Sequence, residues 1–216
     1  MGKRTYLTPT GLKGLLSGSL DTLVREHFIE GIPWYFRNDE SLFKGFCDHF
    51  CKELSISTDA FCLVGSARIG FAVSPDAFPR PFHHGSDLDV AIVSPELFDE
   101  AWFSLVKWGH PRRHTLPAGE LRWMQQRQTE IFWGWLLPDH LRFEGLQFPR
   151  DLNELRRVRS NWFNAFKSVG AMFPGTDLAG REVSGRLYRT PEHLIRYQAE
   201  GLRRLRYRLR EIGGQK

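Results

Sequence analysis

Two aspartates at the start of an apolar segment constrain this chain more than any other feature of its sequence. Asp87 and Asp89 open the run Leu88–Val93, which is otherwise apolar and follows turn residues. Such a run predicts a buried strand. Because side chains alternate along a strand, both carboxylates are expected on one face, where burial of two like charges is costly without a cation. Mg²⁺ or Mn²⁺ is the expected partner, since both prefer oxygen ligands.

A second short strand precedes this one. Phe61–Val64 is a buried-type apolar run that ends at Gly65 and Ser66, which predicts a strand leading into a tight turn. Small residues at such a turn let backbone N–H groups approach phosphate oxygens. A Gly-Ser turn or an Asp-x-Asp pair is common on its own in purely structural roles. The succession of the two, each attached to an apolar strand, is far more specific.

The rest of the chain is predicted to be mainly helical. Residues 1–16 lack periodicity and are expected to form an arm. Further elements are expected as helices over 20–28, 39–54, around 119–137, over 152–169 and from Pro191, with another from Pro95, and as a third strand at Val183–Tyr188. We therefore expect an α+β fold with a single domain over 1–216. It divides into N-terminal helices (17–60), a signature core (61–107), a helical insert (109–180), and a third strand with a C-terminal helix (181–216).

Composition indicates a globular protein without membrane segments. Hydrophobic residues make up 41% and charged residues 25% of the chain, no apolar run could span a bilayer, and the N-terminus lacks a signal-peptide pattern. Cys47, Cys51 and Cys62 are expected as free thiols of a reducing compartment. A cytoplasmic location without a membrane partner is the resulting expectation.

The net charge of +5 has two interpretations. Much of the excess lies near the C-terminus, in Arg203, Arg204, Arg206, Arg208 and Arg210. A cluster of this kind suits a polyanion such as a nucleic acid or a nucleotide, and it also suits a solvated helix face.

The two motifs together resemble those of the DNA polymerase β-like nucleotidyltransferase superfamily. Its hallmark is a strand ending in Gly-Ser or Gly-Gly, a short helix, and Asp-x-Asp on the next strand, which Gly65-Ser66 and Asp87-x-Asp89 match. The resemblance covers residues 39–107 well and 181–212 loosely. It implies a palm with a small mixed sheet flanked by N- and C-terminal helices. It also implies metal-dependent transfer of a nucleoside monophosphate from an NTP to a hydroxyl, with release of pyrophosphate.

The resemblance also implies roles for individual residues. Asp87 and Asp89 would bind the metal ions and serve catalysis. Four residues are candidates for nucleotide binding: Gly65, Ser66, Arg68 and Ser86. Arg68 has a salt bridge to a nearby acid as its alternative role. The acceptor could be RNA, another nucleotide, a protein or a small molecule, and small members of the superfamily often act in bacterial defence, including antiviral defence, or in toxin–antitoxin systems.

Two departures from the family pattern bear on catalysis. The segment between the motifs is long, and residues 75–84 resemble an inserted loop in which His83 and His84 are expected at the surface. The family carries a third carboxylate on a later strand, where this chain has Ser184; Glu182 shares its strand parity and is the expected replacement. Without a third acid, the alternative is a catalytically degenerate module that binds RNA or a protein partner. Arg186, on the same face, is a candidate contact to base or phosphate.

Overall fold

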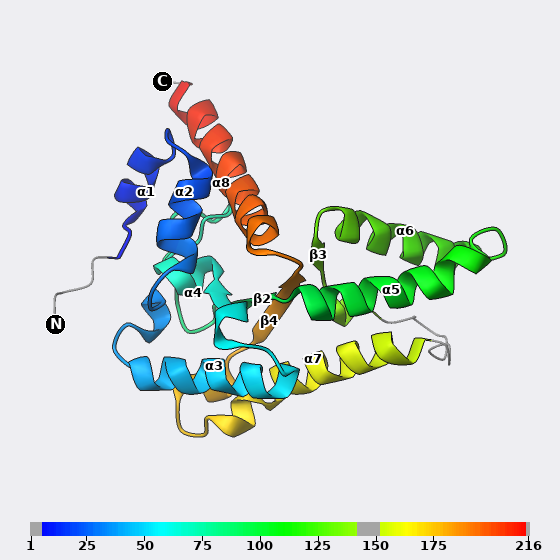
Figure 1. Cartoon of the computed structure of the whole chain (residues 1–216). Coiled ribbons are helices and arrows are strands. Elements are labelled where there is room, and N and C mark those ends of the chain that lie inside the picture. Colours follow the sequence, from blue (N-terminus) through cyan, green and yellow to red (C-terminus); the bar gives the residue numbers. More distant parts are fainter. Residues whose placement is uncertain (1–5, 142–151, 215–216) are drawn as a thin grey trace.

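The computed structural model describes residues 6–141 and 152–214 and has an α+β fold built on one open, four-stranded sheet (Figure 1). The strands, in spatial order, are β1 (Phe61–Val64), β2 (Leu88–Val93), β4 (Val183–Tyr188) and β3 (Trp135–Leu136). The α+β class and the bounds of β1, β2 and β4 are those expected from the sequence. The two-residue strand β3 was not expected.

The pairing of the strands makes the sheet mixed. β2 is parallel to β4 and antiparallel to β1, and β3 is antiparallel to β4. The register places Val64, Asp89 and Ser184 next to one another across three strands. Because directly paired residues share a face, all three side chains lie on the same side of the sheet.

Three helices cover the opposite face of the sheet (Figure 1): α3 (Glu40–Leu54), α5 (Pro95–Arg112) and α7 (Asn153–Met172). Asp39 caps α3 by accepting a hydrogen bond from the Leu42 amide at 2.8 Å, and Ser94 caps α5 by accepting one from the Leu97 amide at 3.2 Å. Their apolar stripes meet the even-numbered residues of β2 in the main core, which includes Phe46, Phe50, Leu88, Val90, Ile92, Phe98 and Trp162.

Helix α7 lies so close to β4 that one strand position has no room for a side chain. A Cβ atom on Gly185 would lie 2.2 Å from Cζ of Phe166 and 2.9 Å from Cζ2 of Trp162. The two rings stack with their centroids 4.7 Å apart. The missing side chain of Gly185 is therefore what lets this aromatic pair rest on the sheet.

The face that carries Asp89 is covered by α8 (Pro191–Gly214), and the short helix α4 (Gly65–Ile69) follows β1 at its edge. The outer half of α8 packs on α1 (Pro9–Leu15) and α2 (Leu20–Val24). The expectation of an arm over 1–16 is therefore wrong for α1, in which Leu12 is fully buried. Gly11 and Gly14 weaken the helical pattern there, and burial against α8 compensates for them.

Residues 109–180, which were expected to form a helical insert, are not helical throughout. Helix α6 (Ala118–Phe132) is present, but Gly134 follows it with a φ of +72°, and the chain then forms β3 against β4. Residues 135–137 were expected to be helical, which is wrong because their partner strand lies some fifty residues later and leaves no local signal. Residues 142–151 lie outside the described part of the chain.

The expectation of free thiols is confirmed, while the reducing compartment stays a prediction. All three cysteines are free, and burial raises the pKa of the Cys62 thiol to about 11, so this thiol stays protonated near neutral pH. Among residues 6–141 and 152–214, no helix has the length and apolar character needed to cross a membrane.

Gly185→Ala tests the contact between β4 and α7. The added methyl group must displace Phe166 or Trp162, and overpacking of this kind costs about 1–3 kcal/mol of unfolding free energy. Gly180→Ala is the matched control, since a Cβ there meets nothing within 4 Å. Urea denaturation of both variants measures the difference, and equal stabilities would contradict the close packing described here.

Candidate functional site

The backbone at Gly65 lies directly against a candidate carboxylate, that of Asp89. It opens α4 with a φ of +67°, in the left-handed region that favours glycine. A Cβ atom here would lie 2.4 Å from Oδ2 of Asp89, closer than side-chain atoms pack. The backbone conformation and the contact with the carboxylate therefore each require glycine at this turn.

Asp89 is the half-buried carboxylate at the centre of the site. Its Oδ1 accepts a hydrogen bond from the Ser184 hydroxyl at 3.1 Å, across the parallel pair β2–β4. Burial raises the pKa of the Asp89 carboxyl above its usual value, and the negative charge of Asp87 adds to the rise. The hydrogen bond from Ser184 and the positive charge of Arg186 offset part of it.

Asp87 differs from Asp89 in its surroundings. It lies one residue before β2 and is exposed, whereas Asp89 lies within the strand. The expectation that both carboxylates are buried is therefore wrong for Asp87. The physical reason is that the pairing of β2 with β4 begins at Leu88, so the preceding residue already extends beyond the sheet.

The backbone of Glu182, the expected third acid, lies next to the start of β2. Its carbonyl oxygen accepts a hydrogen bond from the Leu88 amide at 2.9 Å, just before β4 begins. Its side chain is exposed. Within the part of the chain that the structure describes, no three His, Cys, Asp or Glu side chains are gathered in a metal-binding group. Glu182 is thus adjacent to Asp87 and Asp89 along the strands without being clustered with them.

The other nucleotide-binding candidates fall into two groups. Ser66, in the first turn of α4, and Ser86, in the loop before β2, are half-buried. Ser66 follows Gly65, whose backbone lies against Asp89, and Ser86 directly precedes Asp87. Arg68 is 4% exposed and donates hydrogen bonds to the carbonyl oxygens of His27 at 3.3 Å and Gly31 at 2.6 Å. Its guanidinium therefore fastens α4 to the N-terminal segment through backbone carbonyl oxygens. A contact between Arg68 and a nucleotide stays a prediction.

Arg181 holds the loop before Asp87, a role that no pattern in the sequence indicated. Arg181 precedes β4, and its side chain is 6% exposed. Its Nη1 donates hydrogen bonds to the carbonyl oxygens of His83, His84 and Ser86, at 3.0, 2.9 and 2.8 Å. Three anchor points within four residues fix the path of the chain into β2.

A second set of contacts holds Arg181 itself. Its Nε and Nη2 donate to Oδ2 of Asp177 at 2.9 and 2.6 Å, and the Tyr35 hydroxyl donates to the same oxygen at 3.0 Å. The guanidinium also lies 5.0 Å from the ring centroid of Tyr35 and 4.9 Å from that of Phe82. These bonds hold the pKa of the Asp177 carboxyl below its usual value.

Arg186 brings a positive charge to the face that carries Asp89. Its guanidinium lies 4.2 Å from the ring centroid of Tyr197 on α8 and 4.9 Å from that of Trp135 on β3. These rings hold the cation close to the sheet. Arg186 therefore acts on Asp89 through its charge, while direct contact with a base or phosphate remains a prediction.

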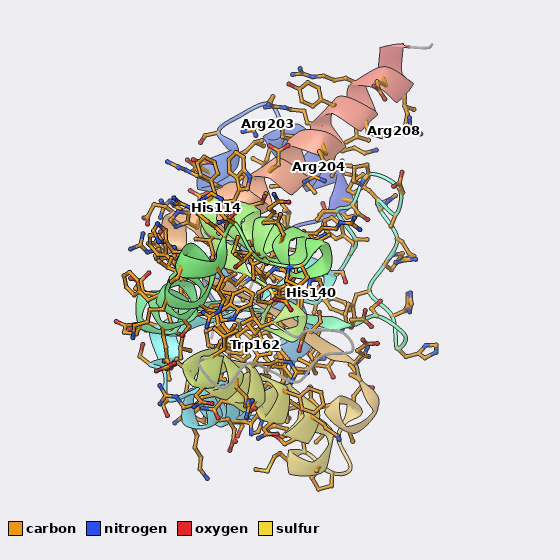
Figure 2. All side chains as sticks on the ribbon, turned by 90° about the vertical axis from the view of Figure 1, so that its right-hand side faces the viewer. His114, His140, Trp162, Arg203, Arg204 and Arg208 are labelled. Carbon is orange, nitrogen blue, oxygen red and sulfur yellow. The ribbon has the colours of Figure 1, made fainter. Side chains whose placement is uncertain are left out.

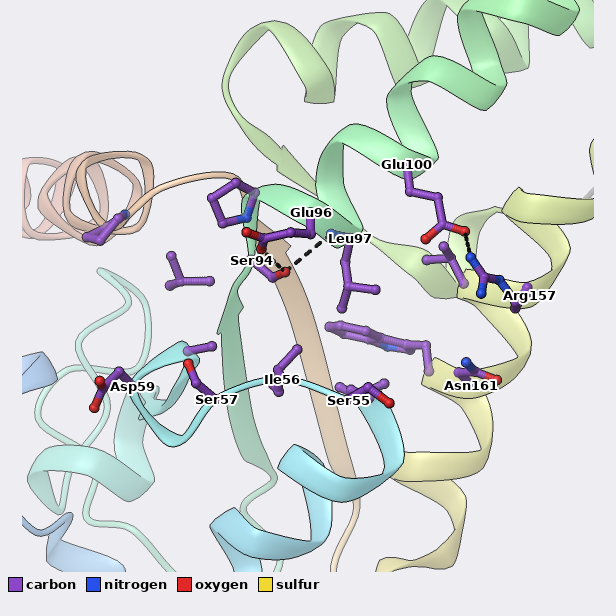
Figure 3. Close-up of a pocket in the computed structure, with 17 residues that line it drawn as sticks. Ser55, Ile56, Ser57, Asp59, Ser94, Glu96, Leu97, Glu100, Arg157 and Asn161 are labelled. Carbon is purple, nitrogen blue, oxygen red and sulfur yellow. Dashed lines mark hydrogen bonds and ion pairs between the residues drawn. The ribbon is translucent and has the colours of Figure 1, made fainter.

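A separate cleft of about 720 Å³ lies at the other end of β2, where Val93 leads into α5 (Figure 3). Figure 3 shows Ser94 and Glu96 from the start of α5, and Arg157 of α7 paired with Glu100. None of the residues given a role from the sequence lines this cleft. The candidate site and the cleft therefore lie at opposite ends of the same strand.

Comparison with protein-family models, with curated proteins and with solved structures returns no significant match. The functional argument therefore rests on the residues of this chain.

Asp89→Asn tests the electrostatic state of the site. The amide keeps the shape and still accepts a hydrogen bond from Ser184. Because the pKa of Asp89 is raised in the folded protein, its charge destabilises the fold above that pKa and ceases to do so below the unfolded value, near pH 4. We expect the variant to gain about 1 kcal/mol of unfolding free energy at pH 7, with the gain shrinking as the pH falls. Urea denaturation across that range measures it, and a loss of stability at pH 7 would contradict the prediction.

Arg181→Met tests the anchoring of the loop before β2. The variant keeps an unbranched chain but removes the Arg181 donor from three carbonyl oxygens, of which that of His83 still accepts a hydrogen bond from the Ser86 amide. The expected cost is about 2–4 kcal/mol of unfolding free energy. Hydrogen exchange should accelerate over residues 83–88. Asp177→Asn is the control, because Arg181 then retains its bonds to the loop. Equal exchange rates at 83–88 in the wild type and Arg181→Met would show that other contacts hold the loop.

Proposed function

We propose that this chain is a metal-dependent nucleotidyltransferase with a DNA polymerase β-like palm, which transfers a nucleoside monophosphate from an NTP to a hydroxyl acceptor. One observation carries the proposal: the positive-φ turn at Gly65 lies directly against the Asp89 carboxylate, with Asp87 two residues earlier. A purely structural turn has no need to bring a bare backbone against a half-buried carboxylate whose pKa is raised. A turn that receives phosphate groups beside metal-binding carboxylates does.

The donor atoms at this turn fit Mg²⁺ or Mn²⁺. Mg²⁺ is commonly bound through one or two carboxylates together with substrate phosphates, and Asp87 and Asp89 supply two carboxylates. Asp89 Oδ2 faces the position that a Cβ of Gly65 would fill. A bound divalent ion would neutralise the charges of the carboxylates and of the triphosphate.

Other residues of the chain would bind the phosphates and take the proton of the acceptor. Gly65 and Ser66 would bind the β- and γ-phosphates through backbone N–H groups at the start of α4. The acceptor oxygen would form its bond to the α-phosphorus as the bond to the α–β bridging oxygen breaks, with pyrophosphate as the leaving group. Glu182 would take the proton of the acceptor hydroxyl, since its backbone adjoins the start of β2.

A second candidate function follows from Ser184. Its register position opposite Asp89 is where a third acid is expected, and its hydroxyl donates a hydrogen bond to Asp89 Oδ1. A serine hydroxyl is no general base near neutral pH. This favours, as the alternative, a module that keeps nucleotide or RNA binding, or a protein partner, without transfer chemistry.

The binding half of the proposal is tested by thermal denaturation with Mg²⁺ and each NTP. A ligand at about 100 times its Kd stabilises the folded protein by about 2.7 kcal/mol. We expect a rise in Tm for the wild type and none for the double variant Asp87→Asn/Asp89→Asn, which should stay folded. Asp59→Asn, an exposed carboxylate at the other end of the sheet, is the control. An unchanged rise in the double variant would reject the site.

The chemical half is tested in the same design by transfer of labelled NMP to RNA, nucleotide and protein acceptors. Glu182→Gln should retain NTP binding and lose transfer, while the exposed Glu53→Gln should retain both. Transfer at the wild-type rate in Glu182→Gln would place the base elsewhere. NTP binding without transfer to any acceptor would favour the degenerate module.

A further inference from the structure

The outer half of α8 concentrates the positive charge of the molecule. Between residues 196 and 212 it carries six arginines and two glutamates, a net charge of +4 against +5 for the whole chain. Figure 2 shows Arg203, Arg204 and Arg208 projecting from this helix. Five of the six arginines are exposed: Arg196, Arg203, Arg204, Arg208 and Arg210. We refer to these five together with Tyr207 as the α8 face.

The sixth arginine shows what a structural role on this helix involves. Arg206 is half-buried, and its Nη1 donates a hydrogen bond to the carbonyl oxygen of Leu16. Leu202 and Leu205 are buried against α1 and α2 in the same interface. The α8 face lies outside this packing, so holding the helix in place does not explain its arginines.

The ion pairs along α8 leave most of this charge available. Glu200 pairs with Arg203 and Arg204, and Glu211 pairs with Arg208, all within one turn of the helix. Exposed pairs of this kind contribute little and are screened by salt. Among the described residues, no carboxylate pairs with Arg196 or Arg210. The α8 face therefore has more cationic donors than its own acids can satisfy.

Tyr207 adds an aromatic ring to the charged surface. It is 55% exposed, and Arg203, Arg204, Arg208 and Arg210 lie within four residues of it on the helix. Surfaces that bind single-stranded nucleic acid combine basic side chains, which follow the phosphates, with exposed aromatic rings, on which bases stack. A surface that binds only by charge does not need the ring.

We propose that the α8 face binds single-stranded nucleic acid, with its arginines on the phosphates and Tyr207 stacked on a base. Arg196 and Arg210 are fourteen residues apart, or about 21 Å along the helix at 1.5 Å per residue. A single strand of several nucleotides can lie along a face of this length. The binding does not depend on nucleotidyl transfer at Asp89.

Fluorescence anisotropy with a labelled twelve-nucleotide RNA, the matching DNA and the RNA duplex tests the proposal. EDTA is present and NTP is omitted, so failure here is separate from failure of the proposed function. Arg204→Gln/Arg208→Gln should weaken single-strand binding at least tenfold. It should also reduce the slope of log K against log salt by about 1.4, because each lost phosphate contact contributes about 0.7. The two single strands distinguish RNA from DNA as the preferred ligand.

Two further comparisons decide the outcome. Lys107→Gln/Arg122→Gln removes the same charge from exposed positions on α5 and α6 and should leave affinity unchanged. Tyr207→Ala should weaken binding, and Tyr207→Phe should restore it. Equal loss in both double variants, no loss with Tyr207→Ala, or equal binding of the duplex would overturn the proposal. Binding to anionic lipid vesicles but to neither single strand would identify a membrane surface instead.

Discussion

The parallel pairing of β2 with β4 is the constraint on which the rest of this structure depends. Parallel neighbours cannot be joined by a tight turn, so a long connection separates the end of β2 at Val93 from the start of β4 at Val183. Helices α5, α6 and α7 and strand β3 all lie in that connection, and α5 and α7 cover one face of the sheet. The same pairing sets Ser184 beside Asp89, so one contact between strands determines both the core and the candidate site.

The elements that could be predicted from the sequence are those with strong local signals. β1, β2 and β4 are short apolar runs beside turn residues, and they form with the expected bounds. α1 and β3 depend on distant partners. Leu12 is buried in a cluster that includes residues of α2 and of the distant helix α8, and Trp135 pairs with Tyr188, more than fifty residues later. No window of neighbouring residues contains that information.

The candidate site likewise has residues that local patterns predict and residues that they do not. The two motifs predicted a site at Gly65, Asp87 and Asp89. The close contact between Gly65 and Asp89 is consistent with that prediction. The alternation of side chains along a strand predicts which residues share a face. It does not predict the residue at which β2 begins to pair with β4, and so it could not show that Asp87 is exposed. Arg181 was beyond reach for a different reason. Its acceptors in the loop are backbone carbonyl oxygens, which every residue possesses, so they leave no pattern of side chains to recognise.

The contacts made by Arg181 and Ser184 have a consequence for the order in which the protein is assembled. Each side chain reaches a group at least 95 residues earlier in the chain. Contacts between distant residues generally form later than local ones, because a long loop must close first. β1 and β2 can pair as soon as both have been synthesised. A nascent chain that ends within α7 therefore already carries both aspartates but lacks the side chains that position them, and the site becomes complete only when β4 joins the sheet.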